Sequence, residues 1–172
     1  MADVADVAAR AGLPVPQAEE LLLDFEAFGW VVRSQFGVSG GWSLTAAGRD
    51  RGEALLGQQV RRLEGLAAAQ RAYAGFLELN AQFLQAITTW QLGSHRDDLL
   101  DDLAAITRSV YPLLELVSPL PWFGDYAQRL RMALSMALVG RREWVDGLEV
   151  ESLHRVWFEL HEDFLVTLGQ TR

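Results

Sequence analysis

Apolar residues recur at intervals of three and four through most of this chain, and short segments containing Gly or Pro interrupt the pattern. That spacing gathers apolar side chains on one face of a helix. The clearest interruptions are a Gly-rich stretch at 36–42, Gly93-Ser94 and Pro119-Leu120-Pro121. The pattern therefore predicts a mainly α protein whose helices are joined by short turns.

The Gly-rich stretch is the one place where strands are expected. Short segments rich in Val and Trp, 30–32 and 42–44, flank the glycines, and this order is typical of an antiparallel β-hairpin. Helical spacing predicts helices over 3–11 and 17–28 before the hairpin. After it, the spacing predicts a long helix over 46–92, kinked at Gly57 or Gly65, and further helices over 97–117, 123–139 and 150–168.

Composition excludes several classes of protein. Half of the residues are hydrophobic, which is too many for a disordered acidic tail. The absence of Cys excludes a disulfide scaffold, a Cys-ligated zinc site and a cysteine nucleophile. No apolar run approaches the roughly 18 residues of a membrane span, and the first ten residues carry acids without a basic signal region. We therefore expect a cytoplasmic protein that does not contact membranes.

The charge of the chain also bears on its origin. Fifteen basic residues face 23 acidic ones, for a net charge of −8, and every basic residue is Arg. Arg codons are rich in G and C, whereas Lys codons are rich in A and T. Together with the abundance of Ala, Gly and Leu, this usage predicts a GC-rich bacterial genome.

The first 55 residues carry the order of features that a helix-turn-helix with a β-hairpin wing requires. Ala8 is small enough for two helices to cross, Gly12 suits the turn, and Leu13 is apolar directly after it. Thr45 is placed to cap the helix that follows the hairpin. An apolar stripe would hold the second helix against the first; its residues are Ala18, Leu22 and Phe25.

Residues 3–55 resemble the winged-helix domain of MarR-type bacterial transcription regulators. The resemblance rests on Val7-Ala8, Gly12-Leu13, Leu22, Phe25, Gly29-Trp30-Val31 and Leu44-Thr45-x-x-Gly48-Arg49. It implies that 17–28 enters the major groove of double-stranded DNA, that 33–41 reaches the backbone or minor groove, and that a helical homodimer releases DNA when a small ligand binds. The DNA-contacting residues it implies are Arg10, Gln17, Arg33, Ser34, Gln35 and Arg49.

We expect two domains, a winged helix-turn-helix over 1–55 and a bundle-like helical domain for ligand binding and dimerisation over 56–172. In the last predicted helix, Trp157, His161 and Phe164 follow His154 by three, seven and ten residues. At helical spacing these four residues share one face. Imidazoles among aromatic rings are typical of a ligand pocket in which a few polar groups orient the ligand. The alternative is that both His residues border an ordinary core.

Aromatic residues elsewhere in the second domain extend the predicted pocket. Asn80 is polar within an apolar stripe and needs a hydrogen-bond partner if buried. The complete predicted set for a small hydrophobic or aromatic ligand is Tyr73, Asn80, Phe83, Trp90, Trp122, Tyr126, His154, Trp157 and His161. His154 and His161 are about 10.5 Å apart along a helix, too far to share one ion, so no metal is expected there. No cofactor is expected either.

Three functions remain open at this stage. The first is a ligand-responsive transcription regulator. The second is a protein that sequesters an aromatic natural product and confers self-resistance to an antibiotic without binding DNA. It is favoured by the carboxylates Glu19, Glu20, Asp24 and Glu26, which lie in the segment 17–28 where DNA readers are usually basic. The third is a small enzyme that uses His154 or His161 as a base.

Overall fold

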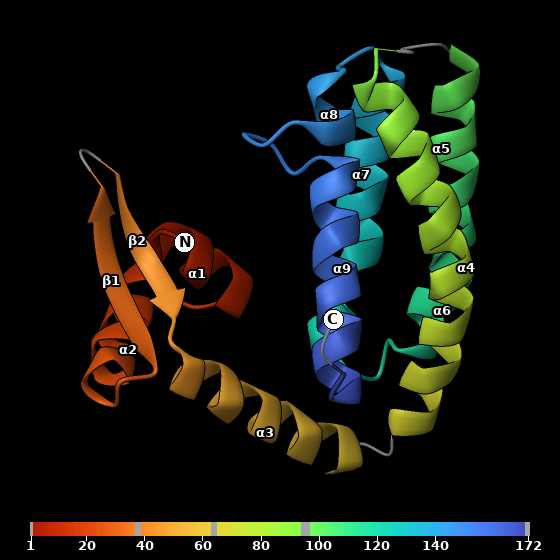
Figure 1. The fold of residues 1–172 in the computed structure, drawn as a ribbon. Coiled ribbons are helices and arrows are strands. Elements are labelled where there is room, and N and C mark those ends of the chain that lie inside the picture. Colours follow the sequence, from red (N-terminus) through yellow and green to blue (C-terminus); the bar gives the residue numbers. More distant parts are fainter. Residues whose placement is uncertain (1, 37–38, 63–64, 94–96, 171–172) are drawn as a thin grey trace. The chain divides into compact units, whose positions relative to one another are not determined.

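The computed structural model describes residues 2–36, 39–62, 65–93 and 97–170, without the side chains of Gln35, Phe36, Ser39 and Asp97. The chain divides into two compact units, Met1–Leu56 and Gly57–Arg172. The described residues are mainly helical and contain one antiparallel sheet of two strands (Figure 1). This confirms the mainly α class and the β-hairpin that the sequence predicts.

The N-terminal unit consists of two helices, the hairpin and the beginning of a third helix. The first helix begins at Asp3, whose carboxylate accepts a hydrogen bond from the amide of Asp6 at 2.8 Å, and it ends at Gly12 in the left-handed conformation. Pro16 lies in the first turn of the second helix, where the missing N–H costs nothing. The elements are α1 (Val4–Ala11), α2 (Val15–Ala27), β1 (Val31–Phe36), β2 (Ser39–Leu44) and α3 (Ala46–Arg62).

The hairpin is longer than the sequence predicts, because its strands continue toward the glycines. Pairing runs from Val31 opposite Leu44 to Phe36 opposite Ser39. Its inner face packs on α2 in a small core of Leu22, Val31 and Trp42, with Val4 and Val7 of α1 partly buried against them.

A joint between the hairpin and α3 confirms that Thr45 caps this helix. The Thr45 hydroxyl donates to the carbonyl of Gly29 at 2.7 Å and accepts from the amide of Gly48 at 3.0 Å. Gly48 itself is required by close packing, since a Cβ there would lie 1.9 Å from the carbonyl oxygen of Trp30. The start of α3 is thus tied to the end of the turn before β1.

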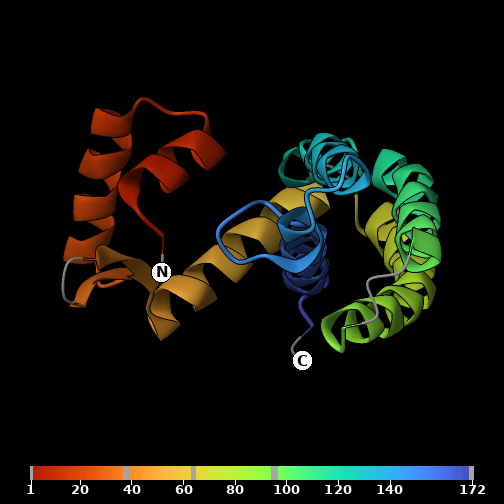
Figure 2. The same ribbon diagram turned by 90° about the horizontal axis from the view of Figure 1, so that it is seen from above.

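Four long helices form the helical unit, and successive long helices run in opposite directions (Figure 1). Neighbours contact in a ring, α4 with α5, α5 with α7, α7 with α9 and α9 with α4, which Figure 2 shows from above. The long helices are α4 (Leu66–Gln91), α5 (Asp97–Ser109), α7 (Tyr126–Leu138) and α9 (Leu153–Leu168). Shorter ones connect them: α6 (Tyr111–Leu116), the 3-10 turn η1 (Pro121–Phe123) and α8 (Glu143–Asp146).

Several predicted helix boundaries are wrong. The helix predicted over 46–92 is two helices, since α3 ends at Arg62 and α4 begins at Leu66. Gly65, one of the two predicted kink positions, is the N-cap of α4, and a Cβ there would lie 2.5 Å from the Leu120 side chain. At Gly57 the helix simply continues. The helix predicted over 97–117 is interrupted at Val110, because Pro112 has no N–H to donate to the carbonyl of Arg108. Helix α8 was not predicted, and α9 begins at Leu153 with Ser152 as its cap.

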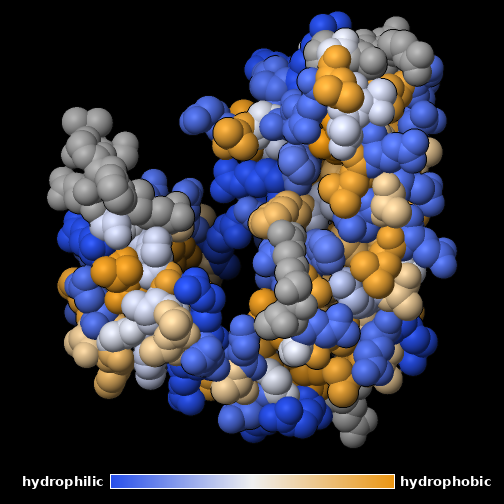
Figure 3. Space-filling model, in the orientation of Figure 1, coloured by the Kyte–Doolittle hydropathy of each residue, from blue (hydrophilic) through white to orange (hydrophobic). Residues whose placement is uncertain are grey.

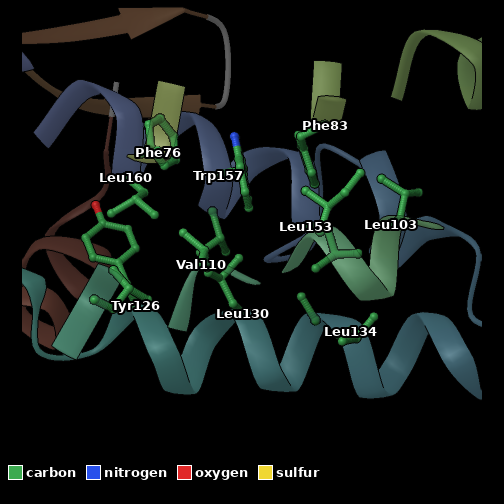
Figure 4. Close-up of a cluster of buried hydrophobic side chains, with 14 of the residues drawn as sticks. Phe76, Phe83, Leu103, Val110, Tyr126, Leu130, Leu134, Leu153, Trp157 and Leu160 are labelled. Atoms are coloured by element: carbon green, nitrogen blue, oxygen red, sulfur yellow. The ribbon is translucent and has the colours of Figure 1, made fainter. Parts of the chain in front are cut away.

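The core of the helical unit is aromatic and aliphatic and draws on all four long helices (Figure 4). Phe76 and Phe83 enter it from α4, Leu103 from α5, Leu130 from α7 and Trp157 from α9, and each is at most 2% exposed. No helix within the described ranges is long and apolar enough to cross a membrane.

Candidate functional site

Four of the six residues that the sequence assigns to DNA have exposed side chains in the N-terminal unit. Arg10 is exposed in the last turn of α1, and Gln17 is exposed in the first turn of α2. Arg33 is exposed on β1, with its guanidinium 5.7 Å from the centre of the Trp42 ring. Arg49 is exposed at the start of α3. Ser34 is half-buried on β1, and the side chain of Gln35 lies outside the described residues.

The surface of α2 is acidic. Glu19, Glu20, Asp24 and Glu26 are all exposed, and the carboxylate of Glu26 accepts a hydrogen bond from the backbone amide of Arg33 at 3.3 Å. DNA phosphates repel carboxylates. Positive charge on this unit therefore comes from α1, β1 and α3 rather than from α2.

In the helical unit, five of the predicted ligand residues meet where α4 packs on α9. The indole N–H of Trp157 donates to the amide oxygen of Asn80 at 2.9 Å. The Trp157 ring stacks on Phe83, with ring centres 4.2 Å apart and planes 7° apart. The Tyr73 hydroxyl lies 3.3 Å from Nε2 of His161. Asn80 therefore has the hydrogen-bond partner that its position in an apolar stripe requires.

The remaining predicted ligand residues lie apart from that group. Trp122, in η1, donates its indole N–H to the hydroxyl of Thr167 at 2.9 Å. The Tyr126 hydroxyl donates to the Asp163 carboxylate at 2.6 Å. Trp90 is buried at the end of α4, and His154 is half-buried in the first turn of α9. The structure thus gathers Tyr73, Asn80, Phe83, Trp157 and His161 and separates them from the other four.

A charged network that the sequence analysis missed joins α7 to α9. Arg129 donates from Nε to Glu151 at 2.7 Å and from Nη2 to Glu159. Arg155 lies 3.3 Å from Glu159, one turn away on α9. Opposite charges four residues apart were a visible signal for that last pair. Nothing in the spacing could place Arg129 beside Glu151 and Glu159.

Two groups in this region, Tyr126 and Arg129, have raised pKa values. Burial raises the pKa of the Tyr126 phenol, and the Asp163 carboxylate raises it further. Burial alone would lower the pKa of Arg129, but its hydrogen bonds to Glu151 and Glu159 outweigh burial and raise that pKa. Tyr126 is therefore neutral and Arg129 charged at every physiological pH. This state favours binding and structure over proton transfer.

Two of the hollows in the described part of the helical unit bear on a ligand site. One, of about 340 Å³, lies beside the charged network, and its lining comprises Asp125, Gln128, Arg129, Met132, Trp144 and Glu151. The other, of about 430 Å³, lies between α4 and α5 and is lined by Gln82, Gln85, Ala86, Thr89, Leu99, Asp102, Ala105 and Ile106. Arg129 and Glu151 line the first hollow while they bind one another, so that hollow has a fixed polar wall.

The first hollow has the makeup of a small-molecule site. Trp144 is half-buried and Met132 is 54% exposed, and together they offer apolar surface. Asp125 and Gln128 add oxygen atoms that accept hydrogen bonds. Among the described residues no cluster of three or more His, Asp or Glu side chains could hold a metal ion.

No family model, no curated protein and no solved structure matches this chain.

Proposed function

We propose that this protein is a ligand-responsive transcription regulator. Residues 1–56 serve as a winged-helix DNA-binding unit, and the helical unit binds a small hydrophobic or aromatic molecule that changes DNA affinity. The observation that carries the proposal is the order α1, turn, α2, hairpin, α3 around a core of its own, with Arg10, Arg33 and Arg49 exposed. The resemblance of 3–55 to MarR-type regulators supports the same function.

On this proposal, DNA is held through the edges of the unit. The exposed carboxylates of α2 keep most phosphates away from its length, so Gln17 at its N-terminal end is the α2 side chain assigned to base contact. The hairpin residues Arg33, Ser34 and Gln35 are assigned to the backbone or minor groove. Arg10 and Arg49 are assigned to flanking phosphates.

The ligand is assigned to the hollow beside Trp144 rather than to the α4–α9 contact. At that contact Phe76, Phe83 and Trp157 are at most 2% exposed and stack on one another, so they fill the space that a ligand would need. Trp144 and Met132 would pack on an apolar ring. Asp125 and Gln128 would accept hydrogen bonds from amino or hydroxyl groups on the ligand.

Titration with labelled duplex DNA tests the proposal that the protein is a transcription regulator. Wild-type protein should bind labelled GC-rich duplex, and affinity should fall steeply between about 50 and 200 mM salt as counterions are released. Arg33→Ala and Arg49→Ala should each weaken binding and reduce the slope of log affinity against log salt by about 1. Arg142→Ala, which removes an exposed arginine of the helical unit, is the matched control and should bind as wild type does.

A second candidate function follows from the acidic surface of α2. The exposed Glu19, Glu20 and Asp24 suit a protein that sequesters a small molecule without touching DNA. Absence of DNA binding at low salt would overturn the proposal of a transcription regulator. The sequestering function then predicts that tryptophan fluorescence responds to one member of a panel of aromatic natural products, and that Trp144→Ala weakens this response about tenfold or more. Leu148→Ala, at an exposed position outside the hollow, is the control.

A further inference from the structure

Helix α4 presents an outward face of small and aliphatic residues with a seven-residue repeat. Its inward face is buried in the bundle through Phe76, Phe83 and Trp90. On the outward face, Leu77 is 44% and Leu84 is 47% exposed. Residues on this face alternate at steps of three and four, and all are exposed: Ala67, Gln70, Ala74, Leu77, Ala81, Leu84 and Thr88.

The order of residues along this face is informative. Ala occupies one position of the repeat at 67, 74 and 81, with Thr at 88, and Leu occupies the other at 77 and 84, with Gln at 70. A repeat of seven with apolar residues at two positions is the seam by which helices pack side by side. Small Ala side chains let two helix backbones approach closely and leave room for Leu from a partner. Figure 3 shows hydrophobic surface along the part of the helical unit where α4 runs.

Charges beside the seam indicate what the partner is. Arg71 and Glu78 lie on one edge, both exposed, and within the described ranges neither makes an ion pair. They are seven residues, or about 10.5 Å, apart along the helix, so they cannot pair with one another. A single edge therefore carries both halves of an ion pair, which a second copy of the same edge would complement.

We propose that the outward face of α4 binds α4 of a second copy of this chain in antiparallel orientation. A two-fold axis near residues 75 and 76 places Ala74 opposite Leu77 of the partner subunit and Ala67 opposite Leu84 of the partner subunit. The same axis brings Arg71 next to Glu78 of the partner subunit, twice by symmetry. The two helices then overlap over about 20 residues, or about 30 Å.

The far edge of the seam decides the orientation. In a parallel pair, each edge meets the opposite edge of its partner. The opposite edge here carries Tyr73 and Asn80, which already bind His161 and Trp157 of α9. A parallel pair would leave Arg71 and Glu78 without complementary charges. In an antiparallel pair, each edge meets the same edge of the partner subunit, so both Arg71 and Glu78 gain a partner of opposite charge. This interface does not depend on whether the protein binds DNA or a ligand.

Molar mass in solution tests the interface. Sedimentation equilibrium of the full chain should give a dimer, and the double variant Leu77→Glu/Leu84→Glu should give a folded monomer with unchanged helical circular dichroism. Leu148→Glu, at a residue 85% exposed on another part of the unit, is the matched control and should remain a dimer. A wild-type chain that stays monomeric at high concentration would overturn the proposal and would mean that this face is covered within one chain or by another partner.

Charge exchange tests the pairing of edges without disturbing the core. Arg71→Glu and Glu78→Arg should each weaken dimerisation about tenfold or more, because like charges then meet twice. Mixing these two variants should restore the dimer, since the mixed pair has complementary charges at both contacts. Single variants that dimerise as tightly as wild type would remove the charge argument.

Crosslinking tests the orientation, and the chain is suited to it because it contains no Cys. In the antiparallel pair, residue 67 and its own copy are about 25 Å apart along the axis, and so are residue 84 and its copy. Under oxidation, Ala67→Cys alone and Leu84→Cys alone should therefore fail to crosslink, whereas their mixture should form a disulfide. Crosslinking of Ala67→Cys alone would show a parallel pair and overturn the proposal.

Discussion

The N-terminal unit and the helical unit use aromatic and basic residues in opposite ways. In the N-terminal unit, the exposed Arg33 and Arg51 lie over the buried ring of Trp42 and the half-buried ring of Trp30, with guanidinium-to-ring distances of 5.7 and 5.5 Å. In the helical unit, Trp157 is buried with its N–H bonded to Asn80. Arg129, also in the helical unit, is held by two carboxylates. Arginines of the first unit remain accessible to a partner, whereas Arg129 is committed to the fold.

The difference has a physical cause in size. Among the described residues, the core cluster of the N-terminal unit consists of Leu22, Val31 and Trp42 with Val4 and Val7 partly buried against them, whereas that of the helical unit extends over all four long helices. A smaller unit encloses a smaller fraction of its surface, so fewer of its polar side chains are buried. The helical unit can enclose indole, phenol and guanidinium groups and still provide their hydrogen bonds. We therefore expect the two units to respond differently to substitution.

Removing Trp157 should have the largest effect. Trp157→Ala removes the stacked contact with Phe83 and leaves the Asn80 amide without its partner, so the free energy of unfolding should fall by about 3–5 kcal/mol. Urea unfolding of the helical unit measures this loss. Leu148→Ala, at an exposed residue, should change it by no more than about 0.5 kcal/mol. A loss below about 1 kcal/mol would show space around Trp157 and would return the ligand to the α4–α9 contact.

Shortening the Leu22 side chain should destabilise the N-terminal unit and leave the helical unit folded. Leu22 is 5% exposed in the small core, and Leu22→Ala should cost about 2–4 kcal/mol there. Hydrogen exchange should then become fast across residues 2–36 and 39–56 while α4, α7 and α9 keep their protection. Leu23→Ala, at the adjacent residue that is 49% exposed, is the control. Equal loss of protection in both units would mean that they unfold as one cooperative body.

Tyr126→Phe should have the smallest effect at neutral pH, about 1–2 kcal/mol, from loss of the hydrogen bond to Asp163. Burial raises the pKa of the Tyr126 phenol above its ordinary value of 10 in the folded state, so the protonated phenol stabilises the folded state. The stabilisation is complete below pH 10 and declines as the pH rises above it, with a limiting slope of about 1.4 kcal/mol per pH unit. Chemical unfolding between pH 8 and 11 measures the slope. The variant should lose less stability than wild type over this range, and parallel curves would contradict the prediction.

Local signals in the sequence determined much of the architecture. Asp3, Gly12 and Thr45 begin or end helices through their own hydrogen bonds and dihedral angles, so they could be recognised without tertiary information. The Gly-rich stretch between Val- and Trp-rich segments was enough to predict the hairpin. Helical spacing also placed His154, Trp157 and His161 on the side of α9 that meets the bundle.

Only the tertiary structure decided which groups became partners. Gly65 lies against the Leu120 side chain, which leaves no room for a Cβ at residue 65, and helical spacing could not predict that contact. Arg129 meets carboxylates 22 and 30 residues away, and Asn80 meets an indole 77 residues away. Periodicity reports which face of a helix is buried, because it depends on neighbours within two turns. It carries no information on which other helix covers that face, so the cavity beside Trp144 and the filled contact around Trp157 could be distinguished only once the helices were packed.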